Sequence, residues 1–130
     1  MGAKFHHIGI ACKNIKLTFQ DLQLFLPSEF EYTDIVYDKT IEASLQLISI
    51  GNQAHIELVS GKVVENLLKK DIRLYHACFE VVDIEEFSAV LKTKGYISLT
   101  KFTPAELFEG RLIQFFKTPL GLIEILEAKK

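Results

Sequence analysis

Two histidines occupy matching positions in two similar stretches of the chain. His7 lies in the stretch FHHIGIACKNI, and His76 lies 69 positions later in the stretch LYHACFEVVDI. Both stretches are typical of β-strands rich in apolar residues, and each is closed by a residue suited to cap a helix, Asn14 in the first and Asp83 in the second. The chain is therefore predicted to be an internal duplication in which each copy supplies one strand histidine.

The last strand expected in each copy carries a glutamate. Glu57 lies in the sequence IEL, and Glu124 lies 67 positions later in the sequence IEI. On a strand, the neighbours of Glu124 on the same face would be Leu122 and Leu126. A carboxylate among leucines is costly unless something compensates its charge, although a glutamate in an apolar strand, taken alone, is more often a surface or strand-edge residue.

The repetition predicts one ligand set, made of two imidazoles and two carboxylates: His7, Glu57, His76 and Glu124. Nitrogen and oxygen donors of this kind suit a divalent transition ion, and the two carboxylates would balance the charge of that ion. Each residue taken alone fits a structural histidine or a surface glutamate, but the pairing at matching offsets favours a metal site.

Two further residues are candidates for the neighbourhood of this site. His55 would share a strand face with Glu57 and could contact a ligand or the substrate. Arg111 could pair with a substrate carboxylate or phosphate, although an exposed arginine at the start of a strand is the simpler interpretation. The sequence contains no Ser-His-Asp order, no glycine-rich phosphate loop and no CxxC pair.

The elements that must position these residues follow the same order in both copies. Hydrophobic periodicity predicts a β-α-β-β-β module in residues 1–60, a connector in residues 61–73 and a second β-α-β-β-β module in residues 74–130, all within one domain. Helices are expected over 14–26 and 84–94, and the strands after them over 30–37, 41–50, 53–59, 96–101, 111–117 and 122–127. The predicted fold class is α+β.

Composition excludes several classes of protein. The 130 residues carry a net charge of −2, which gives no electrostatic reason to expect binding to nucleic acid or to a membrane surface. No apolar run approaches the roughly 20 residues that a membrane-spanning helix requires. The two cysteines do not suggest a disulfide framework, and we expect a cytoplasmic protein with buried thiols.

Four stretches of the sequence resemble the vicinal oxygen chelate superfamily, also called the glyoxalase/bleomycin resistance superfamily: FHHIGIACKNI, HIELVS, LYHACFEVVDI and GLIEILE. Within it they are most similar to methylmalonyl-CoA epimerase and lactoylglutathione lyase-like proteins. The resemblance implies two tandem βαβββ modules that form a curled mixed sheet around a metal cleft. It also implies one divalent ion (Zn, Ni, Co or Mn) held by His7, Glu57, His76 and Glu124, a small-molecule substrate and a homodimer.

The function implied is that of a metal-dependent epimerase or isomerase, or of a lyase, acting on an acyl thioester or a related small carbonyl compound. Glu124 would abstract the α-proton, with Glu57 opposite it, and the resulting enolate would be stabilised. The epimerases resemble one another in a glutamate before the third strand. Residues 38–42 do not match this pattern cleanly, and Glu42 is the one candidate there for a second acid or base. The alternatives are a glutathione-hemithioacetal lyase, a non-catalytic protein that sequesters a small molecule, and an extradiol-type dioxygenase.

Overall fold

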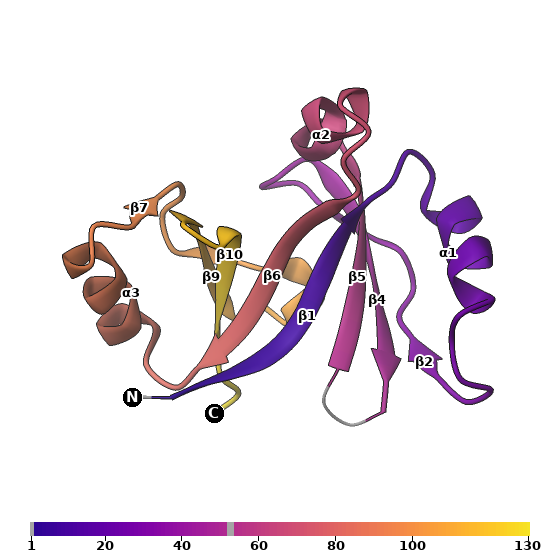
Figure 1. The fold of residues 1–130 in the computed structure, drawn as a ribbon. Helices are drawn as coiled ribbons and strands as arrows, with labels where there is room; N and C mark the ends of the chain where they lie inside the picture. The colour runs from indigo at the N-terminus through magenta and orange to yellow at the C-terminus, as the bar shows by residue number, and fades with distance from the viewer. Residues whose placement is uncertain (1, 52–53) are drawn as a thin grey trace. The chain divides into compact units, whose positions relative to one another are not determined.

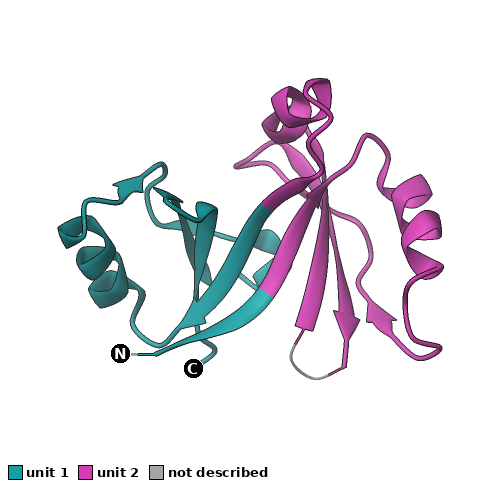
Figure 2. Cartoon of the chain, viewed as in Figure 1, with its two compact units in different colours: residues 1–6, 76–130 teal, residues 7–75 magenta. Residues whose placement is uncertain are grey.

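The structure, a computed structural model, describes residues 2–51 and 54–130. The chain divides into two compact units (Figure 2): unit 1 comprises residues 1–6 and 76–130, and unit 2 comprises residues 7–75. Two strands contribute to both units. The first strand, β1 (Ala3–Ala11), gives residues 3–6 to unit 1 and the rest to unit 2, and β6 (Leu74–Val81) gives residues 74–75 to unit 2.

Unit 2 contains strands joined in the order β2–β4–β5–β1, and β3 also pairs with β4. The pair β1–β5 is parallel, whereas β4 is antiparallel to its three partners. Its elements after β1 are α1 (Ile15–Gln23), β2 (Glu31–Tyr32), β3 (Val36–Asp38), β4 (Ala43–Ile50), β5 (Ala54–Gly61), the 3₁₀-helix η1 (Lys62–Val64) and α2 (Glu65–Lys69).

Unit 1 repeats this arrangement with strands in the order β6–β10–β9–β7, and β8 also pairs with β9. The pair β6–β10 is parallel, and β9 is antiparallel to its partners. Its elements after β6 are α3 (Ile84–Thr93), β7 (Ile97–Ser98), β8 (Thr103–Pro104), the 3₁₀-helix η2 (Glu106–Phe108), β9 (Leu112–Thr118) and β10 (Gly121–Glu127). The predicted α+β class with mixed strand pairing is confirmed (Figure 1).

Both predicted helix caps are present. The side chain of Asn14 accepts a hydrogen bond of 3.0 Å from the backbone N–H of Leu17, and the side chain of Asp83 accepts one of 3.0 Å from Glu86. Each cap satisfies a backbone donor that the first turn of a helix leaves without an intrahelical partner. The caps fix where α1 and α3 begin, directly after the strands that carry the two histidines.

The helices α1 and α3 each cover one face of the strands in their own unit. In unit 2, Ile15 of α1 packs with Ile48 of β4 and Leu58 of β5, and Figure 1 shows α1 along one side of these strands. In unit 1, Ile84 of α3 packs in the same way with Ile125 of β10. Because side chains alternate along a strand, residues adjacent to these core positions point to the opposite face of the sheet, away from the helix.

The irregular segments differ from the sequence-based prediction. The strand expected over residues 30–37 is two short strands, β2 and β3, and the expected loop over 102–110 contains β8 and η2. The strand expected from Ile41 begins at Ala43, because Glu42 has a positive φ of 50° and lies in the turn before β4. The described residues therefore form ten strands where eight were expected. The predicted turn and strand start at 52 and 53 lie outside the described residues.

Candidate metal centre

In unit 2 the structure brings His7 and Glu57 together. The two residues lie on the parallel strands β1 and β5, whose register places Gly9 beside Glu57. The His7 Nε2 atom is 3.7 Å from the Glu57 Oε1 atom, and both side chains are buried. Gly9 has no side chain, so the residue paired with Glu57 places no side chain beside the carboxylate.

In unit 1 the structure brings His76 and Glu124 together. They lie on the parallel strands β6 and β10, whose register places Cys78 beside Glu124. The His76 Nε2 atom is 3.1 Å from the Glu124 Oε1 atom, and both side chains are buried. The ring of Phe115 on β9 meets the His76 ring edge to face, with centroids 5.2 Å apart, which restricts the orientation of the imidazole.

The two pairs are built by the same rule. In each unit the histidine lies two positions before the residue that pairs with the glutamate on the neighbouring parallel strand. Because residues two apart on a strand share a face, the imidazole and the carboxylate project from the same side of the sheet. The duplication inferred from the sequence therefore extends to strand register.

The chemistry of each pair fits a divalent cation. Desolvation makes a buried carboxylate unfavourable unless a positive charge or hydrogen bonds compensate it. Glu57 and Glu124 each have an imidazole nitrogen within 4 Å, and an imidazole nitrogen and a carboxylate oxygen are both donors that zinc, nickel, cobalt and manganese accept. That one ion joins both pairs stays a prediction.

His55 lies on the same strand face as Glu57 and is paired in register with His7. Its Nδ1 atom is 2.8 Å from the hydroxyl oxygen of Ser49, which is its antiparallel partner on β4. The imidazole of His55 is therefore held in place beside the His7–Glu57 pair.

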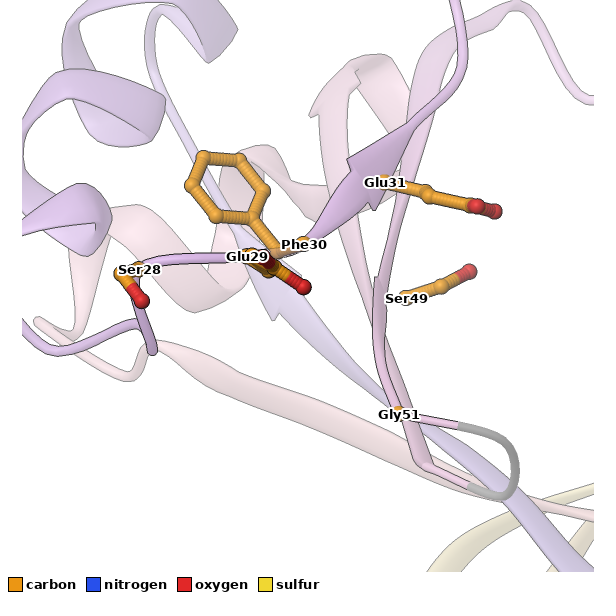
Figure 3. A pocket seen from close by; sticks show the side chains of 6 residues that line it. All are labelled: Ser28, Glu29, Phe30, Glu31, Ser49 and Gly51. Atoms are coloured by element: carbon orange, nitrogen blue, oxygen red, sulfur yellow. The ribbon is translucent and has the colours of Figure 1, made fainter.

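Ser49 also lines an open cavity of about 540 Å³ between β2 and the end of β4, and Figure 3 shows its side chain pointing the same way as that of Glu31.

The sequence did not reveal the contact between Ser49 and His55. Two strands joined by a short turn pair in a register that the turn determines, so residues equally distant from the turn face each other. Pairing outwards from the two-residue turn expected at Gly51-Asn52 would have placed Ser49 opposite Ala54, one position away from His55, its partner in the structure.

Arg111 is held by other residues of unit 1. One of its terminal nitrogens donates to the Glu80 carboxylate at 3.0 Å and to the backbone carbonyl of Glu127 at 3.1 Å. The guanidinium also lies 5.6 Å from the centre of the Phe108 ring. These contacts favour a structural role for Arg111. Glu42 is exposed in the turn before β4 and shares no strand with the ligand pairs.

The family is established by a comparison with known protein families. Residues 6–115 match the Glyoxalase/Bleomycin resistance protein/Dioxygenase superfamily, and the chain belongs to this family. The match includes three of the four predicted ligands, and Glu124 follows it on β10. A comparison with curated proteins found no match. No helix in the described part of the chain is long and apolar enough to cross a membrane.

Solved structures with the same fold include two methylmalonyl-CoA epimerases. The enzyme from Mycobacterium tuberculosis is 18% identical with a TM-score of 0.82, over 98% of this chain and 89% of that one. A Streptomyces coelicolor variant in complex with 2-nitronate-propionyl-CoA is 19% identical with a TM-score of 0.78, over 98% of both chains. A hypothetical protein from Bacillus halodurans is 22% identical with a TM-score of 0.80, over 100% of this chain and 97% of that one. These similarities establish the fold.

Proposed function

We propose that this protein is a metal-dependent epimerase or isomerase that moves a proton at the carbon next to a carbonyl group. The proposed substrate is an acyl thioester or a related small carbonyl compound. The observation that carries the proposal is the duplicated pair of a buried imidazole and a buried carboxylate, His7 with Glu57 and His76 with Glu124. Membership of the superfamily supports it.

The four residues of these pairs would hold one divalent ion. When bound, such an ion acts as a Lewis acid that polarises a carbonyl oxygen and so makes the neighbouring C–H bond more acidic. The donors are two imidazole nitrogens and two carboxylates, which together would leave the site close to neutral. Zinc, nickel, cobalt and manganese all accept this set of donors.

Two glutamates would move the proton. The Glu124 carboxylate removes the α-proton, the C–H electron pair moves toward the carbonyl, and a planar enolate results. Glu57 enters this step in its protonated form, with a proton taken up from solvent, and donates that proton to the opposite side of the carbon, which inverts its configuration. Positioned proton transfer of this kind contributes about 10²–10⁴-fold to a rate. Both carboxylates lie in buried surroundings, where water competes little for their protons.

The substrate class is supported by the fold neighbours. Two of them are methylmalonyl-CoA epimerases, and one of these contains 2-nitronate-propionyl-CoA. A CoA thioester is therefore the first substrate to assay. The glutathione hemithioacetal of methylglyoxal is the second, because a glyoxalase-type lyase uses the same α-proton chemistry. The homodimer and the cytoplasmic location expected from the sequence stay predictions.

The test is isotope exchange at the α-carbon. The protein is reconstituted with cobalt or zinc and incubated with methylmalonyl-CoA in deuterated water, and the substrate mass is followed. We expect one deuteron to enter the α-position. Glu124→Gln should reduce the exchange rate by about 10²-fold or more, because an amide cannot accept the proton. Glu65→Gln, at an exposed position on α2, is the matched control and should leave the rate unchanged.

Two results would contradict the proposal. Full exchange activity in Glu124→Gln would remove this residue as the base. Absence of exchange and of lyase activity with both substrates, in a protein that has bound its metal, would favour the non-catalytic role of binding a small molecule.

A further inference from the structure

A row of polar side chains crosses the strands of unit 2 at the level of His7. Strand register pairs His7 on β1 with His55 on β5, and His55 in turn with Ser49 on β4. Ser49 is paired with Glu31 on β2, and Figure 3 shows these two side chains pointing the same way. Because residues paired in register share a face of the sheet, the row lies on the face that carries Glu57. It therefore runs from the proposed ligands to the open cavity that Ser49 lines.

His55 lies where it can contact a molecule bound at the His7–Glu57 pair. Neighbouring strands are about 4.8 Å apart, so the His55 side chain leaves the sheet one strand spacing from that of His7. It is also on the same face of β5 as Glu57, two positions along the strand. A substrate oxygen that reaches the ligand atoms of this pair therefore comes within range of the His55 imidazole.

Ser49 determines how the His55 ring is presented. The Ser49 hydroxyl oxygen is 2.8 Å from the His55 Nδ1 atom, and both side chains are half-buried. The hydrogen bond at one ring nitrogen decides which of the two nitrogens of a neutral imidazole carries the hydrogen. A hydroxyl that donates to Nδ1 leaves the hydrogen on Nε2, which makes Nε2 a hydrogen-bond donor.

The two copies of the duplication differ at this position. The residue two positions before the glutamate is His55 in unit 2 and Leu122 in unit 1. A strand of this kind therefore accepts an apolar side chain here, and the fold does not require an imidazole. The half-buried histidine of unit 2, held by a second polar residue, is better explained by a contact with a ligand.

We propose that His55 is a catalytic hydrogen-bond donor that holds the carbonyl oxygen of the substrate through Nε2, and that Ser49 is a positioning residue that keeps the hydrogen on that nitrogen. As Glu124 removes the α-proton, negative charge grows on this oxygen and the hydrogen bond from Nε2 strengthens. His55 keeps its hydrogen and transfers no proton. The inference rests on the proposed function, because it names the group that binds the oxygen of the proposed substrate.

The kinetic test follows deuterium exchange into methylmalonyl-CoA by the zinc-loaded protein. His55→Leu should lower kcat by about 10²–10³-fold, as the loss of one donor to a developing oxyanion does. KM should change little, because the hydrogen bond matters most once the charge has developed. His55→Gln keeps a side-chain N–H and should retain more activity than His55→Leu. Ser44→Ala, on β4 but on the opposite face from Ser49, is the matched control and should leave kcat unchanged.

The role of Ser49 is tested through its dependence on His55. Ser49→Ala should lower kcat in the wild type and cost nothing further in His55→Leu, because Ser49 acts only through the imidazole. Ser49→Thr keeps the hydroxyl group and should retain the wild-type rate. Circular dichroism checks that each variant is folded.

A measurement without substrate locates the hydrogen directly. Nitrogen-15 NMR of the histidine rings is recorded on the zinc-loaded wild type at about pH 8, where imidazoles are ordinarily neutral. We expect the hydrogen of the His55 ring on Nε2 and none on Nδ1. Ser49→Ala should weaken this preference, since the donor to Nδ1 is then absent.

The outcomes distinguish this inference from the proposed function. Wild-type kcat in His55→Leu, or a hydrogen found on Nδ1 of the wild-type ring, overturns the role of His55 and leaves the proposed function standing. An equal loss from Ser49→Ala with and without the imidazole overturns the role of Ser49. Absence of exchange and of lyase activity in a wild type that has bound its metal overturns both the inference and the proposed function.

Discussion

At the scale of single residues, the pairs His7–Glu57 and His76–Glu124 show how a sheet can keep carboxylates in its interior. Each glutamate has an imidazole on the neighbouring strand at 3.7 or 3.1 Å. The imidazole limits the cost of burial in the absence of an ion, because it can carry a positive charge or a hydrogen-bonding proton. The same two groups become ligands when the imidazole is neutral.

The buried thiol of Cys12 gives a prediction about pH. Burial raises the pKa of the Cys12 thiol above its ordinary value of 9.0 and outweighs the opposing hydrogen bonds from Thr18 and Val59 and the charge of Arg73. In the unfolded chain the thiol loses its proton at lower pH than in the folded chain. The free energy of unfolding should therefore fall as pH rises above 9.0.

This effect can be measured by urea unfolding between pH 7 and pH 10. The decline above pH 9.0 should be smaller in Cys12→Ala than in the wild type, after the constant loss of stability from the smaller side chain is subtracted. Identical pH profiles in the two proteins would contradict the assignment to Cys12.

At the scale of elements, two buried glutamines show that the duplicated strands are not equivalent. Gln114 on β9 donates to the Thr100 carbonyl at 3.0 Å and accepts from the Ser88 hydroxyl of α3 at 2.6 Å. Gln46 on β4 makes the corresponding donor contact to the Thr33 carbonyl at 2.8 Å. Its Oε1 atom has no hydrogen-bond partner among the described residues. The polar contact that ties helix to strand is thus complete in unit 1 only.

This difference predicts unequal effects of the same substitution. Gln114→Met should lower the free energy of unfolding by about 1–3 kcal/mol, because the Ser88 hydroxyl and the Thr100 carbonyl both lose a buried partner. Gln46→Met should cost less, since methionine has a similar shape and removes a buried oxygen that already lacks a partner. Equilibrium urea unfolding of both variants measures the difference, and an equal or larger loss for Gln46→Met would show the contact with Ser88 to be unimportant.

The elements that could be predicted from the sequence are those with a local signal. The caps at Asn14 and Asp83 and the strands of the duplicated motifs follow from residue type and periodicity. The division of residues 30–37 into β2 and β3 could not be predicted, because it depends on where each half pairs along β4. The structural pairing of Arg111 with Glu80 also lacks a local signal, since 31 positions separate the two residues.

The candidate ligands were found because the chain is duplicated. A single buried histidine has many structural explanations, but two histidines and two glutamates at matching offsets define pairs, and the structure places the members of each pair side by side. Register across parallel strands could not be read from the sequence. The partners of Glu57 and Glu124 on the neighbouring strands, Gly9 and Cys78, were therefore identified only in the structure.

At the scale of the whole molecule, an ion held by both pairs would link the stability of the protein to metal concentration. A ligand that binds only the folded state adds about 2.7 kcal/mol to the free energy of unfolding at a concentration 100 times its Kd. We expect zinc to raise Tm in the wild type and a chelator to reverse the effect.

The variants His7→Ala and His76→Ala test whether one ion is shared. If all four residues bind it, either substitution should remove most of the increase in Tm, although the two histidines come from different units. Differential scanning calorimetry with and without zinc gives the measurement. If the zinc-induced rise in Tm instead has two independent parts, and each substitution removes only one of them, then each pair binds a separate ion.

The way in which β1 is divided between the units has a consequence for synthesis on the ribosome. Unit 2 is continuous in sequence, from residue 7 to residue 75, whereas unit 1 joins the first six residues to the last 55. Chains emerge from the amino terminus and compact parts fold as they are completed. The opening segment of β1, with His6, must therefore wait until residue 108 has been synthesised before the Phe108 ring that contacts the His6 ring exists.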